Sequence, residues 1–147
     1  MKKILIVEDD QLVANIYGNR FSREGFEVKI APDGAAGLEL ARRFQPDVVM
    51  LDLLLPTMSG VELTKRIRTE AKLEHVPIIV FSNAYMTSTM QQALKAGATK
   101  CLSKDDCTPK HVLEVVRRAV SGNREGAPAP GSAAEVQTTS TTGLTPP

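Results

Sequence analysis

The sequence has no tryptophan and only two cysteines, and aromatic residues make up 4% of its 147 residues. Cys101 and Cys107 lack the paired spacing of a zinc site and are too few for a disulfide-stapled secreted domain. No apolar run is long enough to span a bilayer, and the four apolar residues after Met1-Lys2-Lys3 are too few for a signal peptide. These absences predict a cytoplasmic protein with free thiols.

The sequence also lacks an excess of either charge, because its 18 basic and 17 acidic residues leave a formal net charge of +1. This balance gives no electrostatic reason to expect direct binding to nucleic acid or membranes. The length suits one domain with a real core, which we place at residues 1–121. Residues 122–147 are mostly Gly, Pro, Ser, Thr and Ala, so we expect a flexible tail or the start of a linker.

Within the predicted domain, short apolar runs alternate with segments of helical periodicity. The runs predict strands at 4–7, 28–30, 48–51 and 78–81, and a weaker one at 98–102. Helices are expected after Asp10, after Asp33-Gly34, after Ser59-Gly60, over residues 86–96, and from Pro109 to about residue 120. Such alternation predicts an α/β fold whose parallel sheet is covered by helices on both faces.

Polar residues follow four of the five predicted strands: Glu8 and Asp9, then Asp52, Ser82 and Lys104. The carboxyl ends of parallel strands meet at one edge of the sheet, where ligands of such folds bind. Three converging carboxylates favour a hard cation such as Mg²⁺, with Glu8, Asp9 and Asp52 as ligands. An aspartate can itself be the nucleophile that forms an aspartyl-phosphate. Lys104 and Ser82 would then pair with phosphoryl oxygens.

Each of these residues has an ordinary alternative when it is considered alone. The acidic run Glu8-Asp9-Asp10 is typical of a solvated loop or a helix cap, and we assign Asp10 the capping role. Ser82 alone suggests a loop hydroxyl with an ordinary hydrogen bond, and Lys104 alone suggests a surface lysine. The joint placement of these residues at the ends of strands in one inferred sheet favours the phosphorylation site.

Five segments resemble the receiver domain of bacterial two-component response regulators, over about residues 2–120. They are Ile4–Asp10 (ILIVEDD), Leu51–Gly60 (LDLLLPTMSG), Val80–Ala84 (VFSNA), Ala96–Ala98 (AGA) and Lys104. The resemblance implies a flavodoxin-like (βα)5 fold, like that of CheY, with strand order 2-1-3-4-5. It further implies a non-enzymatic signalling switch in a phosphorelay.

The resemblance also implies the roles of individual residues and partners. Asp52 would accept a phosphoryl group from a sensor histidine kinase or phosphotransfer protein, and Ser82 and Lys104 would contact that group. Glu8, Asp9, Asp52 and the backbone carbonyl of Leu54 would hold Mg²⁺, with Asp9 a direct ligand. The signal would pass to a downstream protein partner, or to an output domain beyond residue 147.

Two positions depart from the family pattern. Cys101 stands where the family usually has an aromatic residue in the fifth strand, and Asp105 follows Lys104 where proline is usual. These departures affect how phosphorylation is transmitted. They also keep open a second function, that of a pseudo-receiver that docks a partner without a phosphorylation-driven switch.

Rival functions of other classes fit less well. A phosphatase with an aspartyl nucleophile, like the haloacid dehalogenases, would need a second aspartate two residues after the first, where Leu54 stands. A flavin-binding protein would need a phosphate loop rich in Ser, Thr and Gly after the first strand. The acidic Glu8-Asp9-Asp10 would instead repel a phosphate that lacks a metal.

Overall fold

The computed structural model describes residues 1–83 and 87–123, in which five strands alternate with five helices. The strands are β1 (Lys3–Val7), β2 (Glu27–Ala31), β3 (Val48–Leu51), β4 (Ile78–Ser82) and β5 (Lys100–Ser103). The helices are α1 (Gln11–Arg23), α2 (Gly34–Phe44), α3 (Gly60–Arg68), α4 (Thr87–Ala96) and α5 (Pro109–Asn123). Within the described residues, every helix is too short or too polar to cross a bilayer.

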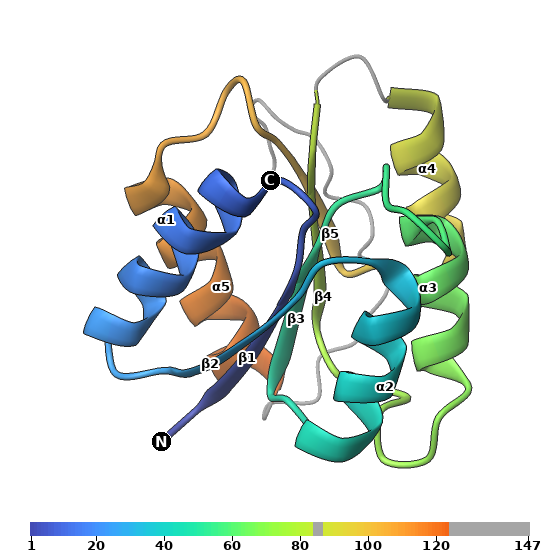
Figure 1. Ribbon diagram of the computed structural model, residues 1–147, viewed down its shortest axis with the longest axis horizontal. Coiled ribbons are helices and arrows are strands. Elements are labelled where there is room, and N and C mark those ends of the chain that lie inside the picture. Colours follow the sequence, from blue (N-terminus) through green and yellow to red (C-terminus); the bar gives the residue numbers. More distant parts are fainter. Residues whose placement is uncertain (84–86, 124–147) are drawn as a thin grey trace.

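The strands form a single parallel sheet in the order β2-β1-β3-β4-β5 (Figure 1). Both the predicted fold class and the strand order implied by the resemblance are therefore confirmed. Val7 is aligned with Leu51, and Ser82 with Ser103, at the carboxyl ends of their strands. The residues after β1, β3 and β5 consequently lie at one edge of the sheet, together with Ser82, the last residue of β4.

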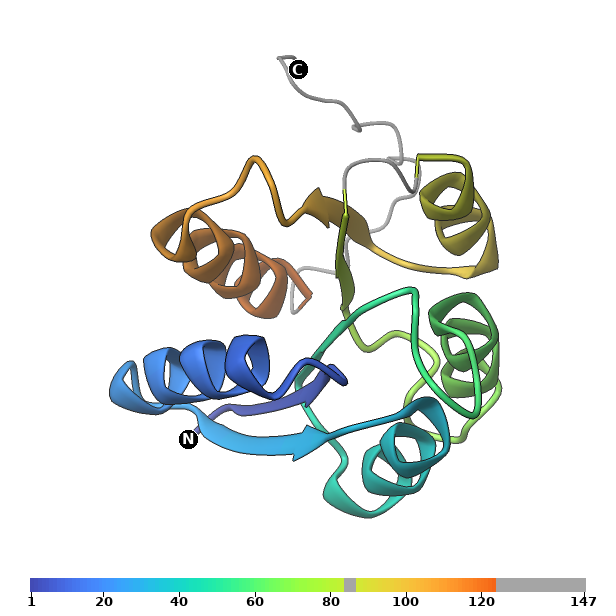
Figure 2. The ribbon, with the colours of Figure 1, turned by 45° about the horizontal axis from the view of Figure 1, so that its top comes forward.

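Helices cover both faces of the sheet. Figures 1 and 2 show α1 and α5 on one side and α2, α3 and α4 on the other. Alternate residues of the central strands face opposite ways: Val7, Leu51 and Val80 pack with α2, α3 and α4, whereas Ile6 and Phe81 pack with α1 and α5. Burial on both faces explains why the central strands are almost continuously apolar in sequence.

Three helices that lead away from this edge begin at capping side chains. Asp10 accepts hydrogen bonds from the N–H groups of Leu12 and Val13, which confirms its predicted capping role. Asp33 caps α2 and Ser59 caps α3 in the same way. Because such caps satisfy N–H groups that have no partner inside the helix, they fix the point where each helix starts.

The structure differs from the sequence predictions at the margins of some elements. Leu12 and Ile16 recur at the helical spacing of the apolar residues in α1, yet they are 69% and 47% exposed. The fifth strand, predicted over 98–102, runs from Lys100 to Ser103. The predicted start of the fourth helix at residue 86 and most of the predicted tail, residues 124–147, lie outside the described residues. The domain boundary at residue 121 stays a prediction.

Candidate functional site

Asp52 directly follows β3 and lies in a largely buried position at the edge of the sheet, with 6% of its surface exposed. Its backbone N–H donates to the carbonyl of Val7, which continues the pairing of β1 with β3. Its carboxylate oxygen Oδ1 accepts hydrogen bonds from the Ser82 hydroxyl at 2.6 Å and from the Leu53 N–H at 2.7 Å. These donors stabilise the negative charge of a carboxylate that is mostly removed from water.

Lys104 supplies a positive charge between two acidic residues. Its ammonium nitrogen Nζ lies 3.0 Å from Asp52 Oδ2 and 2.9 Å from Glu8 Oε1. The backbone N–H of Lys104 donates to the Ser82 carbonyl at 2.7 Å, so the residue is placed by an extension of the β4–β5 pairing. Ser82 is itself fully buried. The structure thus brings Ser82, Lys104 and Asp52 into direct contact.

Lys104 and Glu8, which form an ion pair, influence each other's pKa. Burial alone would lower the pKa of Lys104, but its hydrogen bonds to Glu8 and Asp52 outweigh this effect and raise its pKa. Lys104 is therefore charged at neutral pH. Burial is also the main reason why the pKa of Glu8 is raised, and the nearby charge of Asp52 adds to it. Both shifts follow from the burial of these charged groups and from their contacts with one another.

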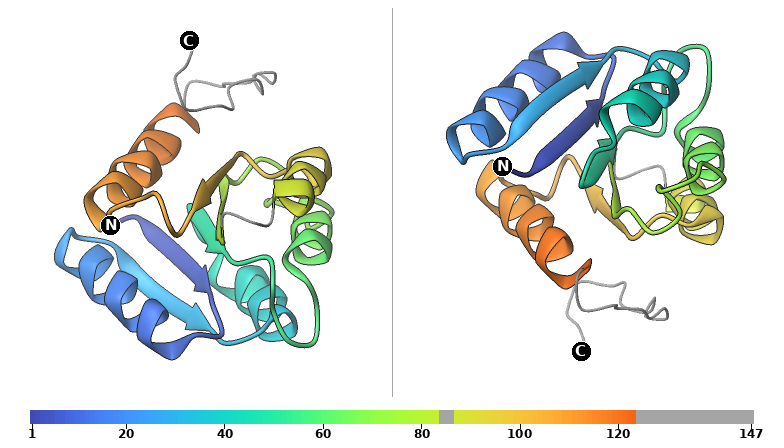
Figure 3. Two further views of the ribbon diagram at one scale, coloured as in Figure 1. Left: turned by 90° about the horizontal axis from the view of Figure 1, so that it is seen from above. Right: turned by 90° about the horizontal axis from the view of Figure 1, so that it is seen from below.

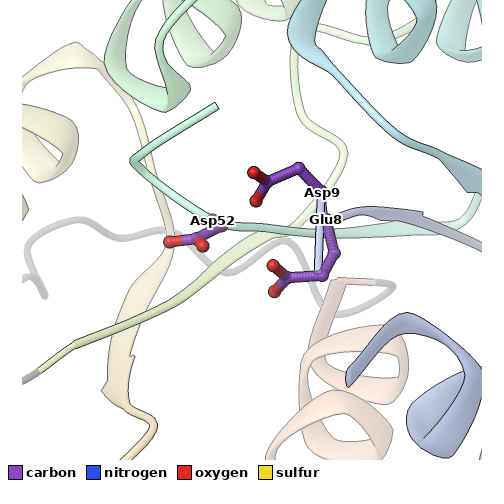
Figure 4. A group of neighbouring side chains, drawn as sticks. All are labelled: Glu8, Asp9 and Asp52. Atoms are coloured by element: carbon purple, nitrogen blue, oxygen red, sulfur yellow. The ribbon is translucent and has the colours of Figure 1, made fainter. Parts of the chain in front are cut away.

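Glu8, Asp9 and Asp52 form an acidic cluster (Figure 4). One carboxylate oxygen from each lies within 4.8 Å of the others, close enough for all three to bind one cation. Glu8 and Asp52 are buried and Asp9 is exposed, so the cluster is open to solvent on the side of Asp9. Asp10 turns away from the cluster to cap α1, while its backbone N–H donates to Glu8 Oε2 at 3.1 Å.

Leu54, whose backbone carbonyl is the fourth predicted ligand of Mg²⁺, belongs to the segment that follows Asp52. The Leu54 side chain is 53% exposed, whereas the neighbouring Leu53 side chain is buried. Cys101 and Asp105, the two departures from the family pattern, also lie near this edge of the sheet. The Cys101 thiol faces the carbonyl of Met90 on α4 at 3.6 Å, and the Asp105 N–H donates to the Ser103 hydroxyl.

Sequence reasoning missed the contact of Phe81 with the site. The Lys104 ammonium lies 5.9 Å from the centre of the Phe81 ring, and this ring meets Tyr17 of α1 edge-on at 5.1 Å between centroids. Phe81 was predicted only as the last residue of the strand at 78–81. Its position immediately before Ser82 was the one available signal, but nothing in the sequence indicates that the lysine side chain reaches over this ring.

The fold and the acidic edge of the sheet agree with comparisons to known proteins. Residues 4–117 match the family described as the response regulator receiver domain. The match covers most of the chain, and this protein belongs to that family, whose members act in two-component signalling.

Three individual relatives share less than a third of their residues with this chain. The polar-differentiation response regulator DivK of Brucella anthropi is 29% identical over 111 residues, which are 76% of this chain and 90% of that protein. The chemotaxis response regulator CheY4 of Vibrio cholerae is 28% identical, with a TM-score of 0.75 over 81% of this chain and 98% of CheY4. A CheY-like receiver domain protein from Methanospirillum hungatei has a TM-score of 0.80 at 24% identity, over 86% and 99% of the two chains, and supports the fold.

Proposed function

We propose that this protein is a phosphoryl-accepting switch in which Asp52 is the phosphorylated residue. One observation supports this assignment above all: the Ser82 hydroxyl and the Lys104 ammonium contact the two carboxylate oxygens of Asp52 at 2.6 and 3.0 Å. These are the donors that a phosphoryl group on Asp52 would need for its own oxygens. The donor would be a sensor histidine kinase or a phosphotransfer protein that carries a phosphohistidine.

In the proposed reaction a carboxylate oxygen of Asp52 attacks the phosphorus atom. A new O–P bond forms as the N–P bond to the histidine imidazole breaks, and the imidazole keeps the electron pair of that bond. Lys104 exchanges its contact with Asp52 Oδ2 for a phosphoryl oxygen, and the Ser82 hydroxyl turns to donate to another. The negative charge gained at Asp52 thus meets two donors that are already in place.

The acidic cluster fits a hard divalent cation, because it gathers one carboxylate oxygen from each of three residues within 4.8 Å of one another. Among the described residues, only the ammonium group of Lys104 forms ion pairs with the cluster. Glu8, Asp9, Asp52 and the Leu54 carbonyl would hold Mg²⁺, which when bound neutralises charge on the phosphoryl oxygens. Asp9 is the natural direct ligand, since it is exposed and its side chain makes no competing hydrogen bond within residues 1–83 and 87–123. The cofactor assignment rests on this chemistry.

The assignment can be tested with acetyl phosphate, a small phosphoryl donor. Wild-type protein incubated with acetyl phosphate and Mg²⁺ should gain the mass of one phosphoryl group, and Asp52→Asn should gain none. Removal of Mg²⁺ with a chelator should stop the reaction. If the wild-type protein stays unmodified and also fails to bind beryllofluoride, the docking module without a switch becomes the better explanation.

Two variants at adjacent residues, one inside the acidic cluster and one outside it, test the assignment of the metal ligands. Asp9→Asn removes a charge inside the acidic cluster, whereas Asp10→Asn removes one just outside it and keeps a residue that caps helices equally well. We expect Asp9→Asn to abolish both Mg²⁺ binding and phosphorylation, and Asp10→Asn to retain both. Phosphorylation of Asp9→Asn at the wild-type rate would show that the metal ligands are wrongly assigned.

A further inference from the structure

The segment that joins Asp52 to α3, residues 53–59, is held at several backbone positions. We call it the β3–α3 loop. Near its start, the Gly60 N–H donates to the Leu53 carbonyl at 2.9 Å. A Cβ atom at Gly60 would overlap the carbonyl oxygen of Asp52, so only glycine permits this approach. The first residues of the loop are therefore fixed against the beginning of α3.

The far side of the loop is held against α2. The Gly34 N–H donates to the Pro56 carbonyl at 3.1 Å, and a Cβ atom at Gly34 would overlap the carbonyl oxygen of Met58. Leu54 lies between these two fixed regions with a half-exposed side chain that does not itself anchor the loop. The orientation of the Leu54 peptide therefore depends on how firmly its neighbours on both sides are held.

Thr57 has an unusual conformation in this loop. Its φ angle is +66°, in the left-handed region that β-branched residues rarely adopt. Its hydroxyl donates to Asp33 Oδ1 at 3.1 Å and accepts a hydrogen bond from the Ala35 N–H at 3.0 Å. The same Asp33 oxygen caps α2 through the Ala36 N–H. The strained backbone of Thr57 is thus held by hydrogen bonds to the first turn of a neighbouring helix.

We propose that Thr57 is a positioning residue for the Mg²⁺ site, which it serves through its tether to Asp33 and Ala35. The tether holds the far side of the β3–α3 loop on α2, and it would thereby keep the Leu54 carbonyl in the orientation that binding of the cation requires. This inference rests on the proposed function, because it takes the Leu54 carbonyl as a ligand. Thr57 itself would not contact the metal.

The test compares Mg²⁺ affinities of hydroxyl variants, measured by titrating amide chemical shifts with MgCl₂. Thr57→Val keeps the shape and the β-branch but loses both hydrogen bonds. We expect it to weaken Mg²⁺ binding about tenfold, the low end for residues that support metal ligands. Thr57→Ser keeps the hydroxyl and should bind Mg²⁺ as the wild-type protein does.

Thr69→Val is the matched control for loss of a threonine hydroxyl. The Thr69 hydroxyl donates to the Arg66 carbonyl at the opposite end of α3, away from the acidic cluster. Thermal unfolding without Mg²⁺ measures the purely structural cost of each change. If Thr57→Val lowers the melting temperature but binds Mg²⁺ as tightly as Thr69→Val, Thr57 has only a structural role and the inference is wrong.

The same measurements distinguish failure of the proposed function from failure of the role assigned to Thr57. Wild-type protein that binds no Mg²⁺, or an Asp9→Asn variant that binds it normally, would overturn the metal assignment and the role of Thr57 together. Normal binding by the wild type, its loss in Asp9→Asn and unchanged binding in Thr57→Val would overturn the role of Thr57 alone.

Discussion

At the scale of single residues, Cys101 decides the chemistry of the position where the family usually has an aromatic ring. Its thiol is packed against the core on the α4 side of the sheet and faces the carbonyl of Met90. Burial raises the pKa of Cys101 to about 12. Because the thiolate is the reactive form, this cysteine fills space as a small apolar group and has little nucleophilic character at neutral pH.

The raised pKa predicts slow alkylation of Cys101 in the folded protein. An unperturbed thiol of pKa about 8.5 is roughly one quarter thiolate at pH 8, whereas a pKa of about 12 leaves about one molecule in 10⁴. In Cys107→Ser, which retains only Cys101, iodoacetamide should therefore react about 10³-fold more slowly with native than with denatured protein. Mass spectrometry of timed samples measures both rates, and similar rates would contradict burial of the thiol.

The same shift has a consequence for stability. Because the folded pKa is raised, the stabilisation from Cys101 is fully present below the unfolded pKa near 8.5. It is lost as pH rises from there towards about 12. Cys101→Ala should lack this component of the alkaline decline in unfolding free energy.

At the scale of elements, the ends of β4 and β5 connect the site to helices on both faces of the sheet. Cys101 of β5 contacts α4, and Phe81 of β4 contacts both the Lys104 ammonium and Tyr17 of α1. A change of partner at Lys104 moves its positive charge relative to the Phe81 ring, which attracts cations. We therefore expect phosphorylation to be felt at α1 as well as along β5.

Beryllofluoride, which mimics a phosphoryl group on aspartate, provides the test for this pair of strands. Its addition should shift amide resonances around Tyr17 in α1, and Phe81→Leu should reduce those shifts while leaving the shifts next to Asp52 in place. Phe26→Leu changes another aromatic residue of the same core and serves as the control. Shifts confined to the immediate neighbours of Asp52 in the wild-type protein would rule out this connection.

At the scale of the whole molecule, the acidic cluster would link the proposed binding of Mg²⁺ to the stability of the fold. Glu8 and Asp9 follow β1 and Asp52 follows β3, so the three carboxylates meet only when the sheet is formed. A cation held by all three binds the folded state and not the unfolded chain, and it must therefore stabilise the protein. Lys104 bridges Glu8 and Asp52, and in the part of the chain that the structure describes Asp9 has no ionic partner.

Magnesium should consequently raise the melting temperature. For a dissociation constant of about 1 mM, 10 mM Mg²⁺ adds about 1.4 kcal/mol to the free energy of unfolding. For a domain of this size, that corresponds to a shift of about 5 °C. Differential scanning calorimetry in MgCl₂, against NaCl of equal ionic strength, measures the shift. Asp9→Asn should melt at a higher temperature than the wild type without metal and should show no response to Mg²⁺.

Much of the fold and of the site was predictable because buried parallel strands have a clear pattern. The apolar runs of β1, β3 and β4 end abruptly at polar residues, and their shared direction places Glu8, Asp52 and Ser82 at one edge. The order of the strands came from the resemblance to receiver domains, since alternation of strands and helices alone allows several orders.

Other features depend on contacts between distant segments and leave no local signal. Leu12 and Ile16 continue the helical periodicity of α1 but lie outside the contact with the sheet. The left-handed Thr57 could not be predicted, since threonine disfavours that conformation and its partner Asp33 is 24 residues away. The position of Lys104 over Phe81 likewise arises from the path of the loop after β5.

Figure 3 shows the parallel strands of the sheet from above and from below, and the order of those strands along the chain has a consequence for biosynthesis. A ribosome delivers β1 and β3, with Glu8 and Asp52, well before it delivers Lys104. The nascent chain that pairs these two strands brings like charges together while their only described lysine partner is still unmade. We therefore expect the pairing of β1 with β3 to become stable only after β5 and Lys104 have been synthesised, so that the domain folds as one unit.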